Sequence, residues 1–483
     1  MLFNSIDFAI FLPIVFICYW YIFNGNLKAQ NFFLAFVSYI FYGWWDYRFL
    51  ALIFLSSLID FNIGQRINNS KSTKQKKSLL LLSLLVNLGI LGYFKYANFF
   101  IENFTEAFSF FGRNLSVQSL QIILPVGISF YTFQTLSYTI DVYRKNIEGE
   151  HNFTSFLAYV SFFPQLVAGP IERATNLLPQ FRKPRNFNYP IAVDGLKQML
   201  WGFFKKLVIA DNCAILANEI FNNYQDYNSV TLILGALFFT FQIYGDFSGY
   251  SDIAIGTARL FGFNLMQNFA FPYFSRDIAE FWRRWHISLS TWFRDYLYIP
   301  LGGSKGSNWF KVRNTFIIFL VSGFWHGANW TFIIWGLLNA IYFLPLLLTK
   351  RNRRNLNPIS ENRIFPSVKE FASIAGTFCL TVLAWIFFRA ENLNHAISYI
   401  LKILTNSGSY FLQTIYLKQA FTTLLLISTF VMVEWIGRKG KYGIEFTIGI
   451  RSKKIRWGIY LLLLSLTLLF MNTGEQAFIY FQF

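Results

Sequence analysis

The run NTFIIFLVSGFWHGANWTFIIWGLLNAIYFLPLLL, residues 314–348, contains no Lys, Arg, Asp or Glu and holds one histidine, His326. Two membrane helices fit into it, at about 314–328 and 331–348. Counting from Asn314 at the rise of an α-helix places His326 roughly 18 Å deep, slightly past the midplane of an apolar core about 30 Å thick. An ionisable side chain at that depth is costly and usually faces a cavity inside the protein. The run therefore predicts a membrane protein with a functional site at His326.

The rest of the chain has the same apolar character. Of its 483 residues, 54% are hydrophobic, 21% aromatic and 14% charged, which excludes a disordered or an ordinary soluble protein. Among the recurring apolar runs, residues 154–169 contain Pro164 and precede Pro170, and we expect this run to be re-entrant or interfacial. We predict an all-α polytopic integral membrane protein with roughly 11–12 transmembrane helices and both ends outside. It forms one domain over residues 1–483, with a motif-bearing core at about 119–390.

The net charge of +18 is concentrated in loops. Residues 64–77 carry five basic and no acidic residues, and residues 438–456 carry seven basic residues against one acidic. Basic loops of this kind mark the cytoplasmic side of a membrane protein, so the charge does not require a nucleic acid partner. The expected location is the cytoplasmic (inner) membrane of a bacterium, in contact with membrane lipid.

The three cysteines, Cys18, Cys213 and Cys379, lie scattered on apolar stretches without the spacing of metal ligands. They are expected to be small buried hydrophobic residues. The chain also contains no HExxH motif, P-loop or GxSxG motif. We therefore expect no metal and no bound cofactor.

His326 stands beside residues suited to a reactive centre. Trp325 and Asn329 flank it within SGFWHGANW, and Gly323 and Gly327 allow close approach of a backbone or a ligand. A buried neutral imidazole is a good general base, because burial keeps it unprotonated near neutral pH. The alternative is a hydrogen-bonded structural histidine that joins helices.

A second histidine, His286, lies in AEFWRRWHISLSTWFRDYLYIPLGG, residues 279–303. Apolar residues recur there at spacings of 3, 4, 3 and 4, which predicts one helix at the cytoplasmic interface, with Arg283 off the apolar stripe. His286 falls at the edge of that stripe, where it can face a cavity. The alternative is an interfacial anchor whose histidine has no role.

The segment YGDFSGYSDIAIG, residues 244–256, interrupts a long apolar run with polar residues. Asp246 and Ser248 are the residues placed to bind a polar ligand near the cytoplasmic boundary. The equally weighted alternative is an ion pair with an arginine of residues 279–303.

These segments carry a family resemblance. FWRRWHISLSTWFRDYLYIPLGGSKGS followed by FLVSGFWHGANWTFIIWG is similar to the membrane-bound O-acyltransferase family, in the branch with the membrane subunit of alginate O-acetylation. The segments 124–144, 162–173, 202–211 and 385–390 resemble further blocks of that branch. The resemblance implies that His326 is the catalytic histidine and His286 the second active-site position. It also implies a conduit from a cytoplasmic acyl donor to an outer acceptor.

The resemblance implies an O-acyltransferase that moves an acyl group, expected to be acetyl, from a cytoplasmic thioester towards hydroxyls of an exported polysaccharide. The expected donor substrate is acyl-CoA. A periplasmic or membrane-anchored acetyltransferase is the expected protein partner. Substrate-binding candidates are Asn329, Trp325, Arg283, Asp246 and Ser248.

Other functions remain open at the level of sequence. Within the family, the acceptor can instead be peptidoglycan, teichoic acid or lipid. A transporter or flippase also needs a polar site near the midplane, but the chain has no evident inverted repeat. A purely structural scaffold would leave the polar interruptions at 244–256 and 322–330 without a purpose.

Overall fold

The computed structural model describes most of the chain, in residues 1–110, 119–167, 169–405, 411–472 and 478–479. The regular elements in these ranges are helices, and none of the described residues forms a strand. This confirms the predicted all-α fold class.

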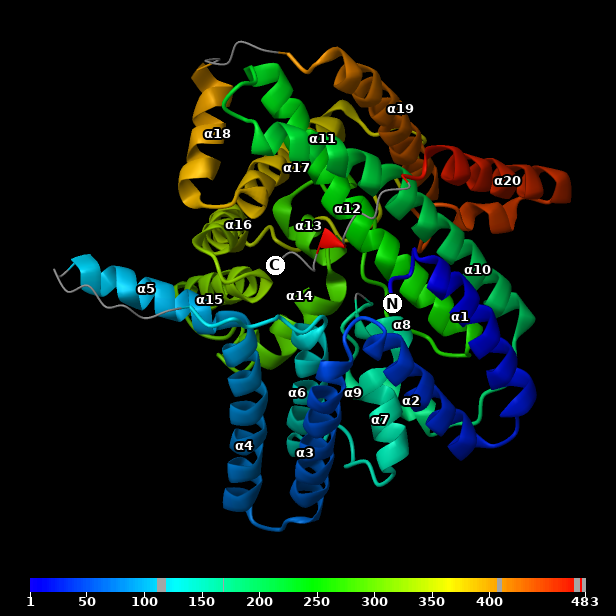
Figure 1. Ribbon diagram of the computed structural model, residues 1–483. Helices are drawn as coiled ribbons and strands as arrows, with labels where there is room; N and C mark the ends of the chain where they lie inside the picture. The colour runs from blue at the N-terminus through cyan, green and yellow to red at the C-terminus, as the bar shows by residue number, and fades with distance from the viewer. Residues whose placement is uncertain (111–118, 168, 406–410, 473–477, 480–483) are drawn as a thin grey trace. The chain divides into compact units, whose positions relative to one another are not determined.

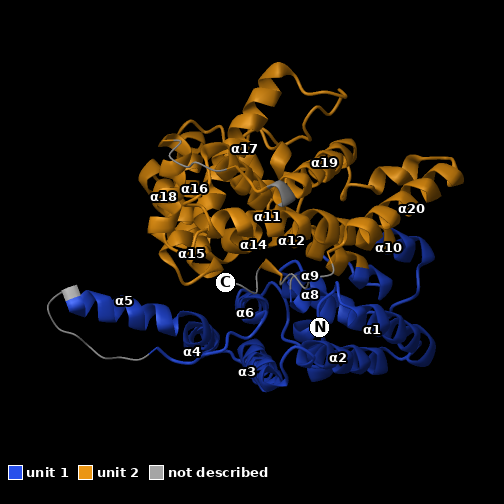
Figure 2. Ribbon diagram, turned by 45° about the horizontal axis from the view of Figure 1, so that its top comes forward, with its two compact units in different colours: residues 1–195, 257–266 blue, residues 196–256, 267–483 orange. Residues whose placement is uncertain are grey.

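The described residues form two compact units, which Figure 2 shows in different colours. Unit 1 consists of residues 1–195 and 257–266, and unit 2 consists of residues 196–256 and 267–483. The assignment of one domain to residues 1–483 stays a prediction.

Polar side chains cap the first turns of three helices in unit 1, α1, α2 and α4. Ser5, Asn26 and Ser72 each accept a hydrogen bond from a backbone N–H of the helix that follows. The elements (Figure 1) are α1 (Ile6–Ile17), η1 (Cys18–Ile22), α2 (Leu27–Gly43), η2 (Tyr47–Phe49), α3 (Leu50–Asn69), α4 (Thr73–Leu91), η3 (Gly92–Tyr96), α5 (Ala97–Phe110), α6 (Ile128–Tyr143), α7 (Phe153–Ser161), α8 (Phe163–Leu166), α9 (Ala174–Phe181) and the start of α10 (Tyr189–Phe203).

The helices α3 and α4 are joined by a buried polar cluster. One carboxylate oxygen of Asp60 lies 2.6 Å from the Ser83 hydroxyl, and the other accepts a hydrogen bond of 2.8 Å from Asn87. Thr135 of α6 donates to Asn87 at 3.0 Å. Because a buried polar group costs free energy unless it is hydrogen-bonded, this cluster fixes how the three helices pair.

The predicted non-crossing run 154–169 forms two short helices. The nine-residue α7 ends at Ser161, and the four-residue α8 follows after a break at Phe162. Neither reaches the roughly 20 residues that a membrane crossing needs. The described part of this run therefore agrees with the re-entrant or interfacial prediction.

Unit 2 carries the rest of the helices. They are the remainder of α10, η4 (Phe204–Ala210), α11 (Asp211–Asn222), α12 (Ser229–Leu260, up to residue 256), η5 (Pro272–Phe274), α13 (Ile278–Arg284), α14 (Ile287–Phe293), η6 (Arg294–Tyr298), α15 (Asn308–His326), α16 (Trp330–Leu348), α17 (Val368–Arg389), α18 (Leu393–Thr405), α19 (Thr414–Gly437), η7 (Glu445–Gly449) and α20 (Lys453–Phe470).

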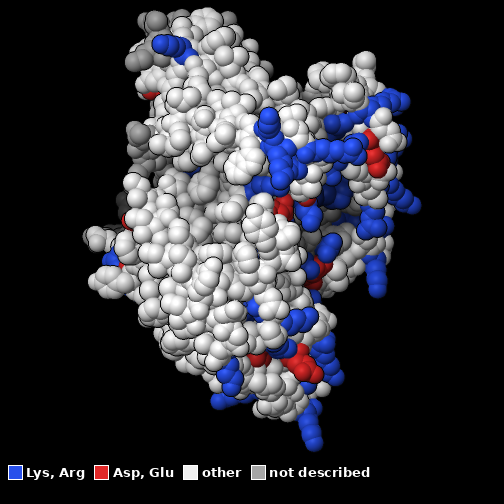
Figure 3. Space-filling model, turned by 90° about the vertical axis from the view of Figure 1, so that its right-hand side faces the viewer, with Lys and Arg blue, Asp and Glu red and all other residues white. Residues whose placement is uncertain are grey.

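Several helical segments among the described residues are long and apolar enough to cross a membrane, and Figure 3 shows a face with wide areas free of Lys, Arg, Asp and Glu. By length and composition these are the six segments Tyr47–Asn69, Thr73–Ser109, Ser229–Leu260, Trp330–Leu348, Val368–Arg389 and Tyr416–Gly437. The protein is therefore a multi-pass membrane protein. The total of 11–12 crossings counts shorter helices too and stays a prediction.

The helices α15 and α16 lie side by side (Figure 1) because glycines remove the side chains between them. A Cβ atom on Gly323 would collide with the carbonyl oxygen of Phe332, and one on Gly336 would collide with that of Phe319. A Cβ on Gly327 would enter the ring of Phe332. The glycines predicted to allow close approach thus serve the packing of α15 against α16.

Candidate active site

His286 lies at a break between two helices, which corrects the prediction of one continuous helix through residues 279–303. The helix α13 ends at Arg284 and α14 begins at Ile287. Between them His286 adopts the left-handed conformation with φ 44° and ψ 55°. A non-glycine residue in that region costs roughly 1–3 kcal/mol and persists only where its surroundings impose it.

Asn268, which the sequence patterns did not single out, holds the start of α14 at this break. Its backbone carbonyl accepts a hydrogen bond of 2.9 Å from Ile287 N, and its side-chain oxygen accepts one of 3.3 Å from Ser288 N. These two bonds satisfy N–H groups at the start of α14 that have no partner within the helix. No local pattern signals this role, because Asn268 acts from a separate loop.

Asn268 also holds the His286 ring. Its side-chain oxygen lies 3.1 Å from Nδ1 of His286 and accepts a hydrogen bond of 2.8 Å from the Ser288 hydroxyl. The Asn268 amide nitrogen donates to the Ser251 hydroxyl at 3.0 Å. His286 is fully buried, and burial lowers its pKa to about 3, so that the ring is neutral near pH 7.

His326 is the last residue of α15 and is enclosed by aromatic rings. Its ring lies edge-on to Trp335 of α16 and to Phe388 of α17, with centroid distances of 5.2 and 5.3 Å. The Trp325 ring lies 4.9 Å away. Only 4% of His326 is exposed, as expected for an imidazole deep in the protein.

The two histidines predicted to act in catalysis come together in unit 2. Their ring centroids are 6.4 Å apart, and Trp325 contacts both, at 6.1 Å from His286. Two imidazoles this close can reach a single reacting group bound between them. Three of the residues named from the sequence therefore form one cluster.

A cavity of about 480 Å³ lies next to this cluster. Its polar lining includes three arginines, Arg283, Arg294 and Arg353. Its apolar lining includes Leu289, Phe293, Ile318, Phe319, Phe343 and Leu347. A pocket of this size with mainly apolar walls and a few charged groups is typical of a site for a small molecule or cofactor.

The cavity reaches the histidine cluster without including either ring. Its lining contains Ser322, which precedes His326 by one turn on the same face of α15. Trp282 lines the same cavity, and its ring lies 5.6 Å from that of Trp335. A group bound in the cavity must therefore pass this last turn and its aromatic rings to reach His326.

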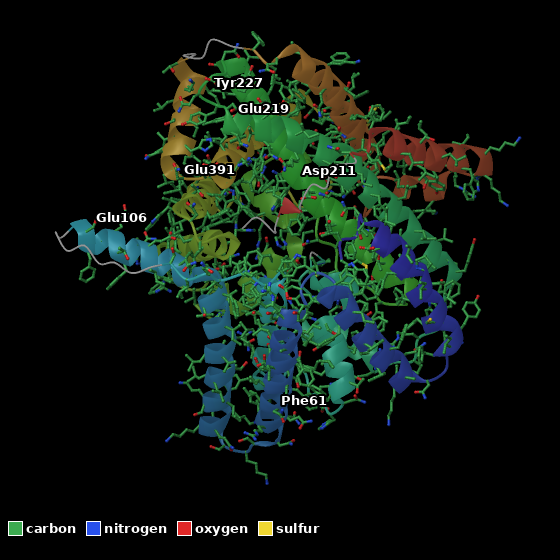
Figure 4. The ribbon with its side chains drawn as sticks, in the orientation of Figure 1. Phe61, Glu106, Asp211, Glu219, Tyr227 and Glu391 are labelled. Atoms are coloured by element: carbon green, nitrogen blue, oxygen red, sulfur yellow. The ribbon has the colours of Figure 1, made fainter. Side chains whose placement is uncertain are left out.

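Arg283 and Asn329 both form hydrogen bonds with backbone groups of the protein. The Arg283 guanidinium lines the cavity and donates to the backbone carbonyls of Asn352 and Asn355, at 2.6 and 2.8 Å. Asn329 caps α16 by accepting from Thr331 N at 3.0 Å, and it donates to the carbonyl of Glu391, a residue labelled in Figure 4. Arg283 keeps a place beside the cavity, whereas both ends of the Asn329 side chain serve the backbone.

Asp246 pairs with a lysine and not with an arginine of residues 279–303. Lys206 of η4 lies 2.8 Å from Asp246 and 2.8 Å from Asp211, which Figure 4 labels. A carboxylate oxygen of Asp246 also accepts a hydrogen bond of 2.7 Å from Ile479 N. Asp246 therefore forms an ion pair, as the alternative predicted, but its partner is Lys206 and the predicted arginine partner is wrong.

Ser248 is buried on α12, and its hydroxyl makes no hydrogen bond to another described residue. Its neighbour Phe247 packs edge-on against the His286 ring, at 4.6 Å between centroids. Ligand binding by Ser248 stays a prediction. Among the described residues, no group of three or more His, Cys, Asp and Glu is placed to hold a metal ion.

Comparison with known proteins identifies the family of the chain. The description "MBOAT, membrane-bound O-acyltransferase family" matches residues 48–387, which include both histidines and the cavity. The chain belongs to this family. The resemblance noted in the sequence is thereby confirmed, and the protein is an O-acyltransferase.

Named relatives of this enzyme are similar over most of its length. It is 43% identical to "Probable alginate O-acetylase AlgI" of Pseudomonas aeruginosa, over 82% of this chain and 73% of the relative. The protein of the same name from Azotobacter vinelandii is 42% identical, over 82% and 76%. "Peptidoglycan O-acetyltransferase" of Helicobacter pylori is 35% identical, over 82% and 78%.

Proposed function

We propose that this enzyme moves an acetyl group from a cytoplasmic acyl-CoA towards hydroxyls of an exported polysaccharide, in the cytoplasmic membrane of a bacterium. The observation that carries the proposal is the buried histidine pair next to an arginine-lined cavity. The similarity to two proteins named alginate O-acetylase supports a polysaccharide acceptor.

The cavity suits a thioester that carries phosphates. Arg283 and Arg353 supply positive charge, whereas Arg294 is paired with Asp295 at 2.7 Å. Arginine is well matched to phosphate geometry. The apolar walls suit an uncharged arm that leads from the phosphates towards Ser322. The thioester end would then enter the histidine cluster, while the charged end stays at the arginines.

In the proposed reaction, the acceptor hydroxyl oxygen attacks the thioester carbonyl carbon. His326 takes the hydroxyl proton as the oxygen–carbon bond forms and the carbon–sulfur bond breaks. The proton then passes to the sulfur, which leaves as a thiol. A positioned imidazole contributes roughly 100- to 10,000-fold to such a step. His286 orients the donor or assists this proton transfer, and Trp325 packs against both rings.

The test is thioester cleavage by the purified full-length protein. Release of free CoA from acetyl-CoA is expected with the wild type and is expected to fall at least 100-fold in His326→Ala. His151→Ala, which changes an exposed loop histidine, is the matched control. Wild-type cleavage by a properly folded His326→Ala protein would remove the proposed mechanism.

Peptidoglycan is the second candidate acceptor, because of the 35% identity to a peptidoglycan O-acetyltransferase. Transfer of radiolabelled acetyl groups to alginate oligosaccharides and to peptidoglycan fragments, each with and without periplasmic extract, separates the two. A requirement for the extract would identify the proposed acetyltransferase partner.

A further inference from the structure

We propose that Asn268 is a positioning residue that holds the proton of His286 on Nδ1, so that Nε2 of His286 accepts a proton during acyl transfer. This inference rests on the proposed function and assigns His286 to proton transfer. It adds a residue outside the two histidine motifs to the reaction machinery.

The orientation of the Asn268 amide follows from one obligatory donor. A backbone N–H can only donate, and Ser288 N lies 3.3 Å from the side-chain atom assigned as Oδ1. That atom must therefore be the oxygen. The amide nitrogen then points to the Ser251 hydroxyl, 3.0 Å away, which can accept. A flipped amide would set two donors against each other at Ser288.

The amide orientation decides which nitrogen of His286 carries the proton. Nδ1 lies 3.1 Å from the Asn268 oxygen, which only accepts. An unprotonated Nδ1 would place two lone pairs face to face. The alternative donor to Nδ1, the Ser288 hydroxyl, is farther from it, at 3.4 Å, and lies only 2.8 Å from the same Asn268 oxygen. The geometry therefore favours the Nδ1–H form, which leaves a lone pair on Nε2.

The same residue fixes the place of the ring as well as its proton. The backbone carbonyl of Asn268 accepts a hydrogen bond from Ile287 N, the residue after His286. This bond holds the backbone of His286 in place between the two helices. Phe247 and Phe269 contact the ring at centroid distances of 4.6 and 6.4 Å and limit its rotation. One loop residue thus sets the backbone, the ring and the tautomer of His286.

Among the described contacts of the His286 ring, Asn268 is the group that determines which ring nitrogen carries the proton. Its ring neighbours Phe247, Phe269 and Trp325 are uncharged, and His326 is the titratable one among the contacts described above. Asp246 and Asp252 of α12 are paired with Lys206 and Lys205, at 2.8 and 2.5 Å. The resting ring is therefore neutral and presents an acceptor, so it receives a proton before it can give one to the departing sulfur.

The activity test compares two substitutions of Asn268. Asn268→Asp keeps an acceptor at Nδ1 and adds a negative charge, which raises the pKa of a neighbouring imidazole. The acidic limb of the kcat profile is expected to move to higher pH by one unit or more, because the base must be unprotonated. Asn268→Leu removes the acceptor, and kcat is expected to fall at least about tenfold with KM changed less than twofold.

The neighbouring substitution Gln267→Ala is the control, since that side chain bonds the carbonyls of Phe269 and Lys441. It is expected to leave the profile unchanged. If Asn268→Leu does not fold, the pH profile of Asn268→Asp alone tests the proposal. An unshifted profile in Asn268→Asp would overturn the proposal.

A second readout does not depend on activity. The chain has four histidines, so ¹⁵N-histidine spectra of the detergent-solubilised full chain can be assigned through His286→Gln. A protonated Nδ1 is expected for His286 in the wild type, and a shift towards protonated Nε2 in Asn268→Leu. Protonated Nε2 in the wild type would overturn the inference. Absence of thioester cleavage together with the expected spectra would instead contradict the proposed function.

Discussion

Trp335 stands edge-on to His326 with 5.2 Å between ring centroids, and the two residues come from the facing helices α16 and α15. Their contact depends on glycines at the helix crossing, where a Cβ on Gly336 would collide with the carbonyl of Phe319. The position of the catalytic candidate is therefore set by backbone-to-backbone packing.

Gly336→Ala is expected to destabilise the protein by about 1–3 kcal/mol, because the added methyl group has to push α15 and α16 apart. Gly376→Ala is the matched control, since a Cβ there meets open space within α17. That change is expected to be neutral or stabilising, as alanine favours a helix. Thermal unfolding in detergent measures both, and equal midpoints would contradict the packing argument.

If the cavity binds the proposed donor, Arg353→Ala is expected to raise KM for acetyl-CoA about tenfold, because the cavity loses one of its arginines. KM for acetyl-pantetheine, which carries no phosphate, is expected to stay the same. Steady-state thiol release measures both values. Arg363→Ala, an exposed arginine outside the cavity lining, serves as the control. A parallel rise for the two donors would show that Arg353 does not recognise phosphate.

Because of His286, the free energy of unfolding is expected to decrease at pH values under about 6.5. Burial lowers its pKa from 6.5 to about 3, so between these values the unfolded chain binds a proton that the folded chain does not. Stability then decreases as the pH falls, by about 1.4 kcal/mol per pH unit. Unfolding midpoints at pH 7.5 and 5.0 test this. The difference between them is expected to shrink in His286→Gln, and an unchanged difference would exclude a buried neutral His286.

Lys206→Met is expected to destabilise the protein by about 3–5 kcal/mol, because Asp211 and Asp246 would lose their shared cation while buried. The adjacent change Lys205→Met removes the separate pair with Asp252. Yield of folded protein and the unfolding midpoint are the measurements. If Lys206→Met instead folds normally and loses only donor binding, Asp246 acts on a ligand and the ion-pair role is wrong.

Much of the candidate site follows from local sequence. His326 is apparent because an uncharged apolar run with one imidazole is rare, and depth follows from counting residues along a helix. Asn329 precedes the helical run WTFIIWG, and asparagine at such a position is a common helix cap, so its structural role could have been found. The apolar content likewise determined the membrane character and the all-α class.

Tertiary structure decided what depends on partners distant in sequence. The apolar stripe of residues 279–303 predicts one helix, but Asn268 accepts the N–H groups that start α14, and Ala270 N donates to the carbonyl of Arg284 that ends α13. His286 between them lies in the left-handed region. The ion pair of Asp246 with Lys206 and the ring contact of Trp335 with His326 both form between helices, so they depend on helix packing. Periodicity and depth are properties of neighbouring residues, whereas hydrogen-bond partners and cavity walls depend on which segments the folded chain brings together.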